Sequence, residues 1–329
     1  MIVWAWVAFL AFVCGILAID LGVLNRKAHV VKMREALLFT LFTIVLAGAF
    51  SAFIYFAYNG HWLGLGSHRD SVDHVVNDGR LAAVKFFTGY VIELSLSMDN
   101  VFVIALIFQH LAVPAKYQHR VLFWGILGAL LMRGSMIGAG AGLVAHYHWI
   151  LYVFGAFLLF TAIRMLTTGM DEAAPDEAAI VRILRRFFPI AEEYDSHHFL
   201  TRKNARTYLT PLAIALVLVE TTDLLFAVDS IPAIFAITAD PFLVFTSNVF
   251  AILCLRSLYF GLASLIERFR YLKVSLAIIL AIVGAKMLLA TRVADWIGPN
   301  LNFWLLGLIA AILGGGALAS ALIPQRTKS

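Results

Sequence analysis

One acidic motif occurs twice in the sequence, as ELSLSMDNV at residues 93–101 and as DLLFAVDSI at residues 223–231. The two stretches align without a gap. Each begins with a carboxylate and has a second carboxylate six residues later, followed directly by a polar residue. These residues are Glu93, Asp99 and Asn100 in the first copy and Asp223, Asp229 and Ser230 in the second. The rest of each motif is mostly apolar, so the acids lie in a hydrophobic context.

The composition of the whole chain places these motifs in a membrane. Hydrophobic residues make up 62% of the 329 residues and charged residues only 14%, whereas soluble domains have about 45–50% and about 25%. A soluble globular protein is therefore excluded. Nine apolar segments are predicted as membrane-spanning helices, at about 2–24, 36–57, 82–109, 121–144, 149–168, 209–237, 243–265, 274–290 and 301–323. The predicted fold is an all-α polytopic membrane protein.

The similarity between the two copies extends beyond the motifs. The span after each motif carries an arginine, Arg133 or Arg256, and the next span ends with Arg164 or Lys286. Two three-helix units are therefore predicted, and because three is odd, the second unit is inverted. The predicted regions are two N-terminal spans (1–80), the first repeat (81–168), a cytoplasmic loop (169–208), the second repeat (209–290) and a final span with its tail (291–329).

The distribution of basic residues predicts the orientation. Alternate loops carry 17 lysines and arginines on one side and 3 on the other, so the first side is predicted to be cytoplasmic, the N-terminus outside and the C-terminus inside. These loops also explain the net charge of +5 without a nucleic-acid partner. Within the cytoplasmic loop, residues 180–188 are expected to form a short amphipathic helix, either on the membrane surface or held by the bundle.

Five acids lie well inside predicted spans, namely Glu93, Asp99, Glu220, Asp223 and Asp229. An isolated ionised acid at a span centre costs roughly 2.5–3.5 kcal/mol, so these side chains must be paired, protonated, hydrated or bound to a cation. A purely structural alternative is that basic residues of the spans pair with them. Arg133, Arg256 and Lys286 are the candidates for structural or gating ion pairs, and Lys85, near a span end, is expected to extend to the interface.

Helix geometry restricts how the acids can cooperate. Residues six apart differ by about 240° around a helix, so Glu93 and Asp99 either face different interfaces or the helix is broken between or beyond them. Pro232 offers a reason for a break in the second copy. The simplest closed site joins Asp99 and Asp229 across the two copies, with Asn100 and Ser230 beside them. Glu93 and Asp223 then complete the shell or form a second station.

The types of side chain suggest which cation such a site would take. Carboxylate, amide and carbonyl oxygens suit Mn²⁺, Mg²⁺ or Ca²⁺, whereas imidazole and thiolate favour zinc or copper. The central parts of both motifs contain no histidine. A divalent cation is thus expected as a transported substrate, with no permanently bound cofactor. We find no nucleotide-binding, hydrolase or intramembrane-protease motif, so the sequence does not predict an enzyme.

Both motifs resemble the signatures of the TerC family of integral membrane proteins, the tellurium-resistance group. The similar stretches are residues 87–102 and 220–233, and further similarity extends over most of the chain. The resemblance implies a bacterial inner-membrane protein connected with manganese export and metal homeostasis. It also implies a cation site at Glu93, Asp99, Asn100, Glu220, Asp223 and Asp229. Met98 departs from the small aliphatic residue usual in the family.

The main hypothesis from the sequence is a secondary transporter that exports Mn²⁺ or a similar divalent cation by alternating access, with exchange for protons as one possible coupling. Its expected partners are the cation and the lipid bilayer, and the sequence identifies no protein partner. One alternative is a non-transporting membrane scaffold or insertion partner in the response to metal stress such as tellurite. Another is an anion transporter that binds its substrate through Arg133 and Arg256.

Overall fold

A computed structural model of the chain describes residues 2–19, 33–167, 177–191, 194–195, 198–203, 206–262, 270–289 and 301–322. Its apolar helices are α1 (Ile2–Ile19), α2 (Met33–Asn59), α3 (Gly79–His110), α4 (Ala115–His146), α5 (Ile150–Thr167), α7 (Pro211–Phe235), α8 (Pro241–Leu262), α9 (Arg270–Leu288) and α11 (Leu301–Leu322). Each predicted apolar segment overlaps one of them. Among the described residues, seven helices are long and apolar enough to cross a bilayer. The prediction of an all-α polytopic membrane protein is confirmed, while the inverted repeat stays a prediction.

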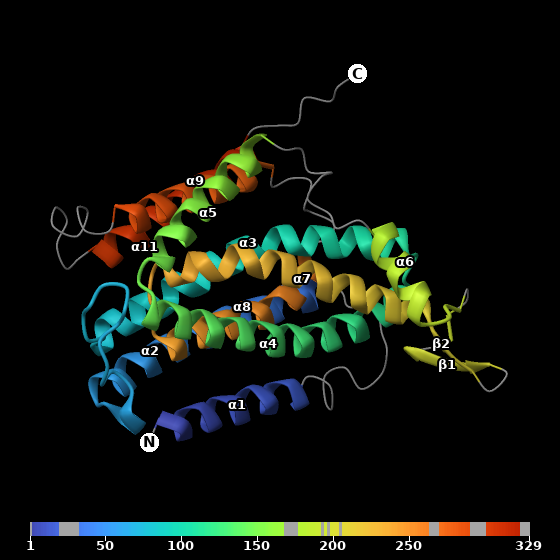
Figure 1. Cartoon of the computed structure of the whole chain (residues 1–329), viewed down its shortest axis with the longest axis horizontal. Coiled ribbons are helices and arrows are strands. Elements are labelled where there is room, and N and C mark those ends of the chain that lie inside the picture. The colour runs from blue at the N-terminus through green and yellow to red at the C-terminus, as the bar shows by residue number, and fades with distance from the viewer. Residues whose placement is uncertain are drawn as a thin grey trace.

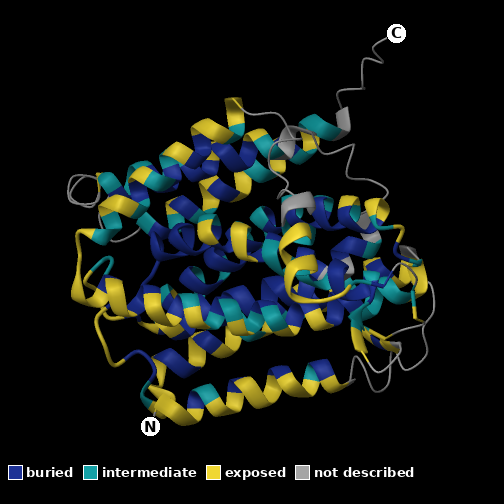
Figure 2. Cartoon of the chain, turned by 45° about the vertical axis from the view of Figure 1, so that its right-hand side comes forward, coloured by how far each residue is buried: buried dark blue, intermediate teal, exposed yellow. Residues whose placement is uncertain are grey.

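The helices form two packed groups (Figure 1). In the larger group, α3 packs against α8 and α4 packs against α7, while α2 lies against both α3 and α8. In the smaller group, α5 packs against α9, and α9 packs against α11. Helix α8 is buried along most of its length, whereas α1 is exposed over much of its surface (Figure 2). Buried apolar clusters fill the interior of the larger group, and a further one lies where α5, α9 and α11 meet α7.

The helices α5 and α9 approach closely because each has a glycine at the contact. A Cβ atom on Gly155 would lie 2.9 Å from Cβ of Met287 and 3.0 Å from the carbonyl oxygen of Gly284. A Cβ atom on Gly284 would lie 2.8 Å from the carbonyl oxygen of Gly155. Larger side chains at either position would push the two helices apart. Helix α7 faces this pair, and Asp229, the second acid of its motif, contacts Thr161 of α5.

The helices that carry the two motifs are continuous. The Asp78 carboxylate caps the start of α3 by accepting a hydrogen bond of 2.7 Å from the Leu81 N–H, and Thr210 followed by Pro211 starts α7. Pro232 lies within α7 without ending it. The predicted alternative of a broken helix is therefore wrong for these segments, and the two acids of each motif face different interfaces because the intact helix separates them by about 240°.

Short elements close both ends of the larger group. At the hairpin end lie α6 (Glu177–Phe187) and a two-stranded sheet of β1 (Leu200–Lys203) and β2 (Arg206–Leu209), in which Leu200 pairs with Leu209. The sequence predicts α6 but not the hairpin. At the opposite end, which we call the loop end, lie the segment 60–78, with the short 3₁₀ turn η2 (Trp62–Gly64), and the turn 236–240 between α7 and α8.

The amphipathic helix α6 has its apolar residues on two sides. Ile180 and Val181 pack against the buried core near this end, so the bundle holds the helix in place. Ile183 and Phe187, together with the following Phe188, are exposed. Both predicted environments of this helix are thus compatible with its position, because one side contacts the bundle and the other is open for a membrane surface.

Candidate cation site

Arg133 occupies the middle of the larger helix group and joins four helices. Its Nε atom donates to Oδ2 of Asp223 at 3.1 Å and its Nη2 atom to Oδ1 of the same carboxylate at 2.9 Å. Its Nη1 atom donates to Oε1 of Glu93 and, at 3.0 Å, to Oδ1 of Asn248. This geometry is the two-point pairing that a planar guanidinium favours with a carboxylate. Arg133 therefore holds one acid from each copy of the motif.

Two further polar residues complete what we call the Arg133 cluster. Asn100 donates from Nδ2 to Oδ1 of Asp223 at 2.9 Å, and Ser230 Oγ lies 3.4 Å from Nη1 of Arg133. The members of the cluster are Glu93, Asn100, Arg133, Asp223, Ser230 and Asn248. All are buried, so the charges are held far from water, where electrostatic interactions are strong.

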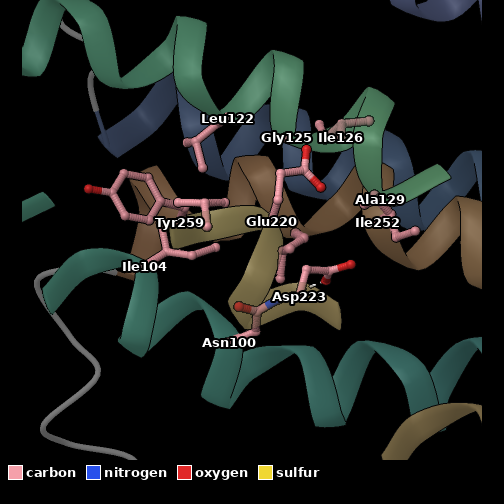
Figure 3. A pocket seen from close by; sticks show the side chains of 12 residues that line it. Asn100, Ile104, Leu122, Gly125, Ile126, Ala129, Glu220, Asp223, Ile252 and Tyr259 are labelled. Carbon is pink, nitrogen blue, oxygen red and sulfur yellow. Dashed lines mark hydrogen bonds between the residues drawn. The ribbon is translucent and has the colours of Figure 1, made fainter. Parts of the chain in front are cut away.

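A small cavity lies directly beside Asp223 (Figure 3). It has a volume of about 30 Å³, and a water molecule needs roughly 10–15 Å³ of such volume. Asn100, Glu220 and Asp223 supply its amide and carboxylate groups, and Tyr259, whose hydroxyl donates to Gln118, lines it together with apolar side chains such as Ile104 and Leu122. The cavity can therefore hold one small ion or one to two water molecules next to two carboxylates.

Two oxygen atoms at this cavity are buried without a hydrogen-bond partner among the described residues, Oδ1 of Asn100 and Oε2 of Glu220. In the Arg133 cluster itself, Oε2 of Glu93 is also buried without a hydrogen-bond partner among the described residues. A buried acceptor that is left unpaired costs about 1–3 kcal/mol. All three atoms are acceptors, so a cation or a water molecule is the kind of ligand that would satisfy them.

Glu220 fits against α4 because that helix has a glycine opposite it. A Cβ atom on Gly128 would overlap the Glu220 carboxylate. The side chain thus lies in a gap that any other residue at position 128 would close. Glu220 and Asp223 are also close enough to repel each other electrostatically. With Glu93, the region contains three acids, and Arg133 is the cation that pairs with Glu93 and Asp223 among the described side chains.

Asp99 and Asp229 do not join this cluster. Asp229 accepts a hydrogen bond of 3.2 Å from Thr161 of α5 and interacts electrostatically with Arg164 of the same helix. Asp99 interacts electrostatically with Lys273 at the start of α9. The sequence predicts a shell built on Asp99 and Asp229, but the structure gives them separate partners in the α5–α9 group. The aligned acids that meet are instead Glu93 and Asp223.

The other basic candidates have different outcomes. Arg133 forms ion pairs with Glu93 and Asp223. Arg256 belongs to α8, but its side chain lies outside the described part of the structure. Lys286 donates to the carbonyl oxygen of Ala236 at 2.9 Å and to Oδ1 of Asn302 at 3.3 Å, so its hydrogen bonds go to neutral oxygens. Lys286 thereby ties α9 to the turn 236–240 and to α11.

A second charged network, which we call the Lys85 cluster, lies at the loop end. The Lys85 ammonium is 2.8 Å from Oδ2 of Asp70, 2.8 Å from Oδ2 of Asp73 and 2.7 Å from Oδ1 of Asn77. Lys85 is fully buried. The expectation that it extends to the membrane interface is wrong, because the segment 60–78 folds back and brings its acids to the lysine.

The Lys85 cluster continues into the turn between α7 and α8. Asp70 accepts hydrogen bonds from Thr238 and, at 2.9 Å, from the Ala239 N–H. Asp240 accepts a hydrogen bond of 2.9 Å from the Tyr58 hydroxyl. Burial alone would raise the pKa of Asp70, but the Lys85 ammonium and the hydrogen bonds outweigh it and lower that pKa from its usual value. The cluster comprises Tyr58, Asp70, Asp73, Asn77, Lys85, Thr238 and Asp240.

The side chains that the structure describes contain no group of three or more His, Cys, Asp or Glu residues placed to hold a metal. The cavity beside Asp223 has two such residues and the amide oxygen of Asn100. Mg²⁺ is commonly held by one or two carboxylates with several waters retained, and the same oxygen donors suit Mn²⁺. The donor set at this cavity is therefore of the right type for a hard, partly hydrated divalent cation.

The comparisons with known proteins agree with the sequence motifs. A match to the integral membrane protein TerC family covers residues 79–328. The chain belongs to the TerC family. This family match begins at the first residue of α3 and so includes both motif helices and the Arg133 cluster.

Several relatives are similar over most of their length. An uncharacterized membrane protein of Myxococcus xanthus is 47% identical over 96% of this chain and 92% of its own. The Alx protein of Escherichia coli K12 is 45% identical over 86% of this chain and 85% of its own. An uncharacterized membrane protein of Rickettsia felis is 37% identical over 94% and 97%, respectively. A search of solved structures gives no match.

Proposed function

We propose that this TerC-family protein is a secondary transporter that exports a divalent metal cation, with Mn²⁺ as the best-suited ion. The observation that carries the proposal is the cavity beside Asp223. There the acceptor oxygens of Asn100 and Glu220 are buried without hydrogen-bond partners among the described residues. A cation would satisfy both atoms and balance the excess of acids over Arg133. In this proposal the cation is cargo, the protein needs no resident cofactor, and it catalyses no covalent chemistry.

The position of the cavity supports a path from one side of the membrane. Its lining residues come from the halves of α3, α4 and α8 that lie toward the hairpin end. By the distribution of basic residues this end faces the cytoplasm, in a bacterial inner membrane with the N-terminus outside. Cytoplasmic Mn²⁺ would thus enter from the hairpin end. Release would then require the loop end, where the Lys85 cluster lies, to open.

Proton exchange is the proposed driving reaction, because a buried carboxylate binds a proton when the cation leaves. Glu220 suits this role through its unpaired, buried oxygen. Asp99 and Asp229 provide further carboxylates at the boundary with the α5–α9 group. The proposal therefore separates a cation station in the Arg133 region from two acids at that boundary that can bind protons.

The test is Mn²⁺ flux into liposomes that contain the purified protein, measured with an encapsulated metal-sensitive dye and a pH dye. We expect flux accompanied by proton movement in the opposite direction, and loss of both in Glu220→Gln and Asp223→Asn. Asp195→Asn, an exposed acid outside the helices, is the matched control and should keep normal flux. Absence of Mn²⁺ flux in correctly folded parent protein would contradict the proposal.

A membrane scaffold is the second candidate function, and the bonding of Arg133 favours it. Arg133 bonds two acids and Asn248, which would suit a rigid joint between helices. In that case Glu220→Gln and Asp229→Asn would alter stability or partner recovery and leave ion flux unchanged. The name of the Escherichia coli relative proposes a redox-modulating role. In this chain the two cysteines, exposed Cys14 and buried Cys254, form no disulfide with each other.

A further inference from the structure

The Arg133 guanidinium lies where Glu93 and Asp223 converge. It bonds both oxygens of Asp223 and one oxygen of Glu93, the carboxylates that come from the two motif copies. Asn248 and Ser230 add neutral oxygens on the same Nη1 atom. A cation surrounded by five or more oxygens is what Mn²⁺ or Mg²⁺ would also require.

We propose that Arg133 is an internal substitute for the transported cation, which it replaces in the metal-free protein and with which it competes. This inference rests on the proposed function. In the metal-free state the guanidinium pairs with both Asp223 and Glu93 and cancels one of their two negative charges. When a metal enters the cavity, it binds Glu220 and the Oδ1 atom of Asn100 first and then takes a carboxylate from Arg133.

The geometry beside Asp223 supports this order of events. Asn100 donates from Nδ2 to Asp223, so its Oδ1 atom is turned away from that bond, and it is buried without a hydrogen-bond partner among the described residues. The cavity that Asn100 and Glu220 line is next to Asp223 (Figure 3). Both oxygens of Asp223 already accept bonds from Arg133. The unpaired oxygens at the cavity are thus the ligands that a metal meets without displacing Arg133, whereas it gains Asp223 fully only if Arg133 withdraws.

An internal cation also gives the transporter a way to return without cargo. Two buried carboxylates without a counter-charge would oppose movement through a low-dielectric region. With Arg133 in place, one of these two charges is cancelled, so reorientation of the empty site costs less. The side chain is attached, so it cannot leave with the metal, and each cycle exchanges one cation for the other at the same acids. Removing Arg133 should then strengthen metal binding and slow the return step.

The experiment measures Mn²⁺ binding by electron paramagnetic resonance on the purified full-length protein, in the parent and in Arg133→Ala. We expect the variant to bind Mn²⁺ about tenfold more tightly or better, because a competing positive charge is gone. Added guanidinium ion should occupy the space left by the side chain and weaken Mn²⁺ binding in Arg133→Ala toward the parent value, with no effect on the parent. Lys85→Gln, which removes a buried cation from the other cluster, should not tighten binding.

If Arg133 has only a structural role, the change in Mn²⁺ affinity and the effect of guanidinium should both have the opposite sign. Arg133→Ala would then bind Mn²⁺ more weakly, and guanidinium would restore binding, which would overturn the inference. If Arg133→Ala does not fold, Arg133→Lys decides the question, since one ammonium group cannot bond both Asp223 oxygens in the same way. Tighter Mn²⁺ binding in Arg133→Lys supports competition, and equal or weaker binding overturns it. Lack of Mn²⁺ binding in the parent would instead contradict the proposed function.

Discussion

The Arg133 cluster and the Lys85 cluster are both buried networks of acids around a basic residue, yet they differ in how completely they are bonded. Among the described side chains, every buried polar atom of the Lys85 cluster has a partner, whereas Oε2 of Glu93 and Oδ1 of Asn100 in the Arg133 cluster have none. Glu220 adds a third unpaired acceptor beside the Arg133 cluster. A satisfied network gives rigidity, while an unsatisfied one is available for a ligand.

The surroundings of the two clusters also differ, since one cluster joins two segments of the chain and the other borders a cavity. The Lys85 cluster ties the segment 60–78 to the turn 236–240 through Asp70 and its bonds to Thr238 and Ala239. The Arg133 cluster borders a cavity. In the proposed function, the Lys85 cluster closes the loop end and the Arg133 cluster takes part in cation binding. A substitution in the Lys85 cluster should therefore change stability, whereas one beside the Arg133 cluster should change cation binding.

The largest expected effect is a loss of stability in Lys85→Met. Removing this ammonium leaves Asp70 buried beside an apolar side chain, and breaking a buried ion pair costs about 3–5 kcal/mol. The free energy of unfolding in detergent, followed by circular dichroism, should fall by that amount. Added Mn²⁺ should not restore it, because this network has no vacant ligand position among its described side chains. Restoration by Mn²⁺ would show that the Lys85 cluster also binds metal and would break the comparison.

Glu220→Gln should affect binding and stability in opposite directions. The amide keeps the size of the side chain but removes its charge, so Mn²⁺ affinity should fall about tenfold or more. Stability should stay equal or rise by about 1 kcal/mol, since the buried, unpaired Oε2 atom of this half-buried side chain no longer carries charge. Mn²⁺ titration and thermal unfolding of the same sample measure both. A Glu220→Gln protein that loses stability and keeps its metal affinity would make Glu220 structural.

Acid should weaken the Lys85 cluster through Asp70. Because its pKa is lowered in the folded protein, Asp70 contributes stability that is fully present above the ordinary carboxyl pKa of about 3.9 and is lost as the pH falls through the lower folded value. The melting temperature of the parent should therefore drop between about pH 5 and about pH 3 more steeply than that of Asp70→Asn. Equal slopes in the two proteins would contradict this role of Asp70.

The smallest effects on equilibrium binding are expected for Asp99→Asn and Asp229→Asn. Both residues have partners in the α5–α9 group rather than in the Arg133 cluster, so Mn²⁺ affinity should change by less than about threefold. Flux is expected to fall more than affinity if these acids carry protons. A large loss of affinity in both variants would move the cation site to Asp99 and Asp229, as the sequence alone predicts.

The sequence predicts the helices well because hydropathy acts locally. All nine apolar segments overlap a helix, and the 240° offset implies that Glu93 and Asp99 face different neighbours if the helix is unbroken. The partner of each acid could not be predicted in this way. Whether Arg133 meets Glu93, Asp99 or both depends on how α3, α4 and α7 are rotated about their axes. A helix that is apolar on every side has no polar face from which that rotation could be predicted.

The Lys85 cluster shows a second limit. Lys85 is near the end of a span, where a lysine usually reaches the interface, and nothing periodic in the segment 60–78 indicates that it folds back over the helix ends. Asp70 and Asp73 therefore could not be assigned from the sequence. The β1–β2 hairpin is not predicted for a similar reason, because its strands have only four residues each and lie in a polar region.

The most direct measurement of the central claim is the location of bound Mn²⁺ by anomalous scattering from crystals of the full-length protein grown with the metal. We predict a single peak in the cavity beside Asp223, at coordination distance from Oδ1 of Asn100 and the Glu220 carboxylate, with Arg133 withdrawn from at least one of its acids. A peak at Asp99 or Asp229, or at the Lys85 cluster with Arg133 unmoved, would contradict the account.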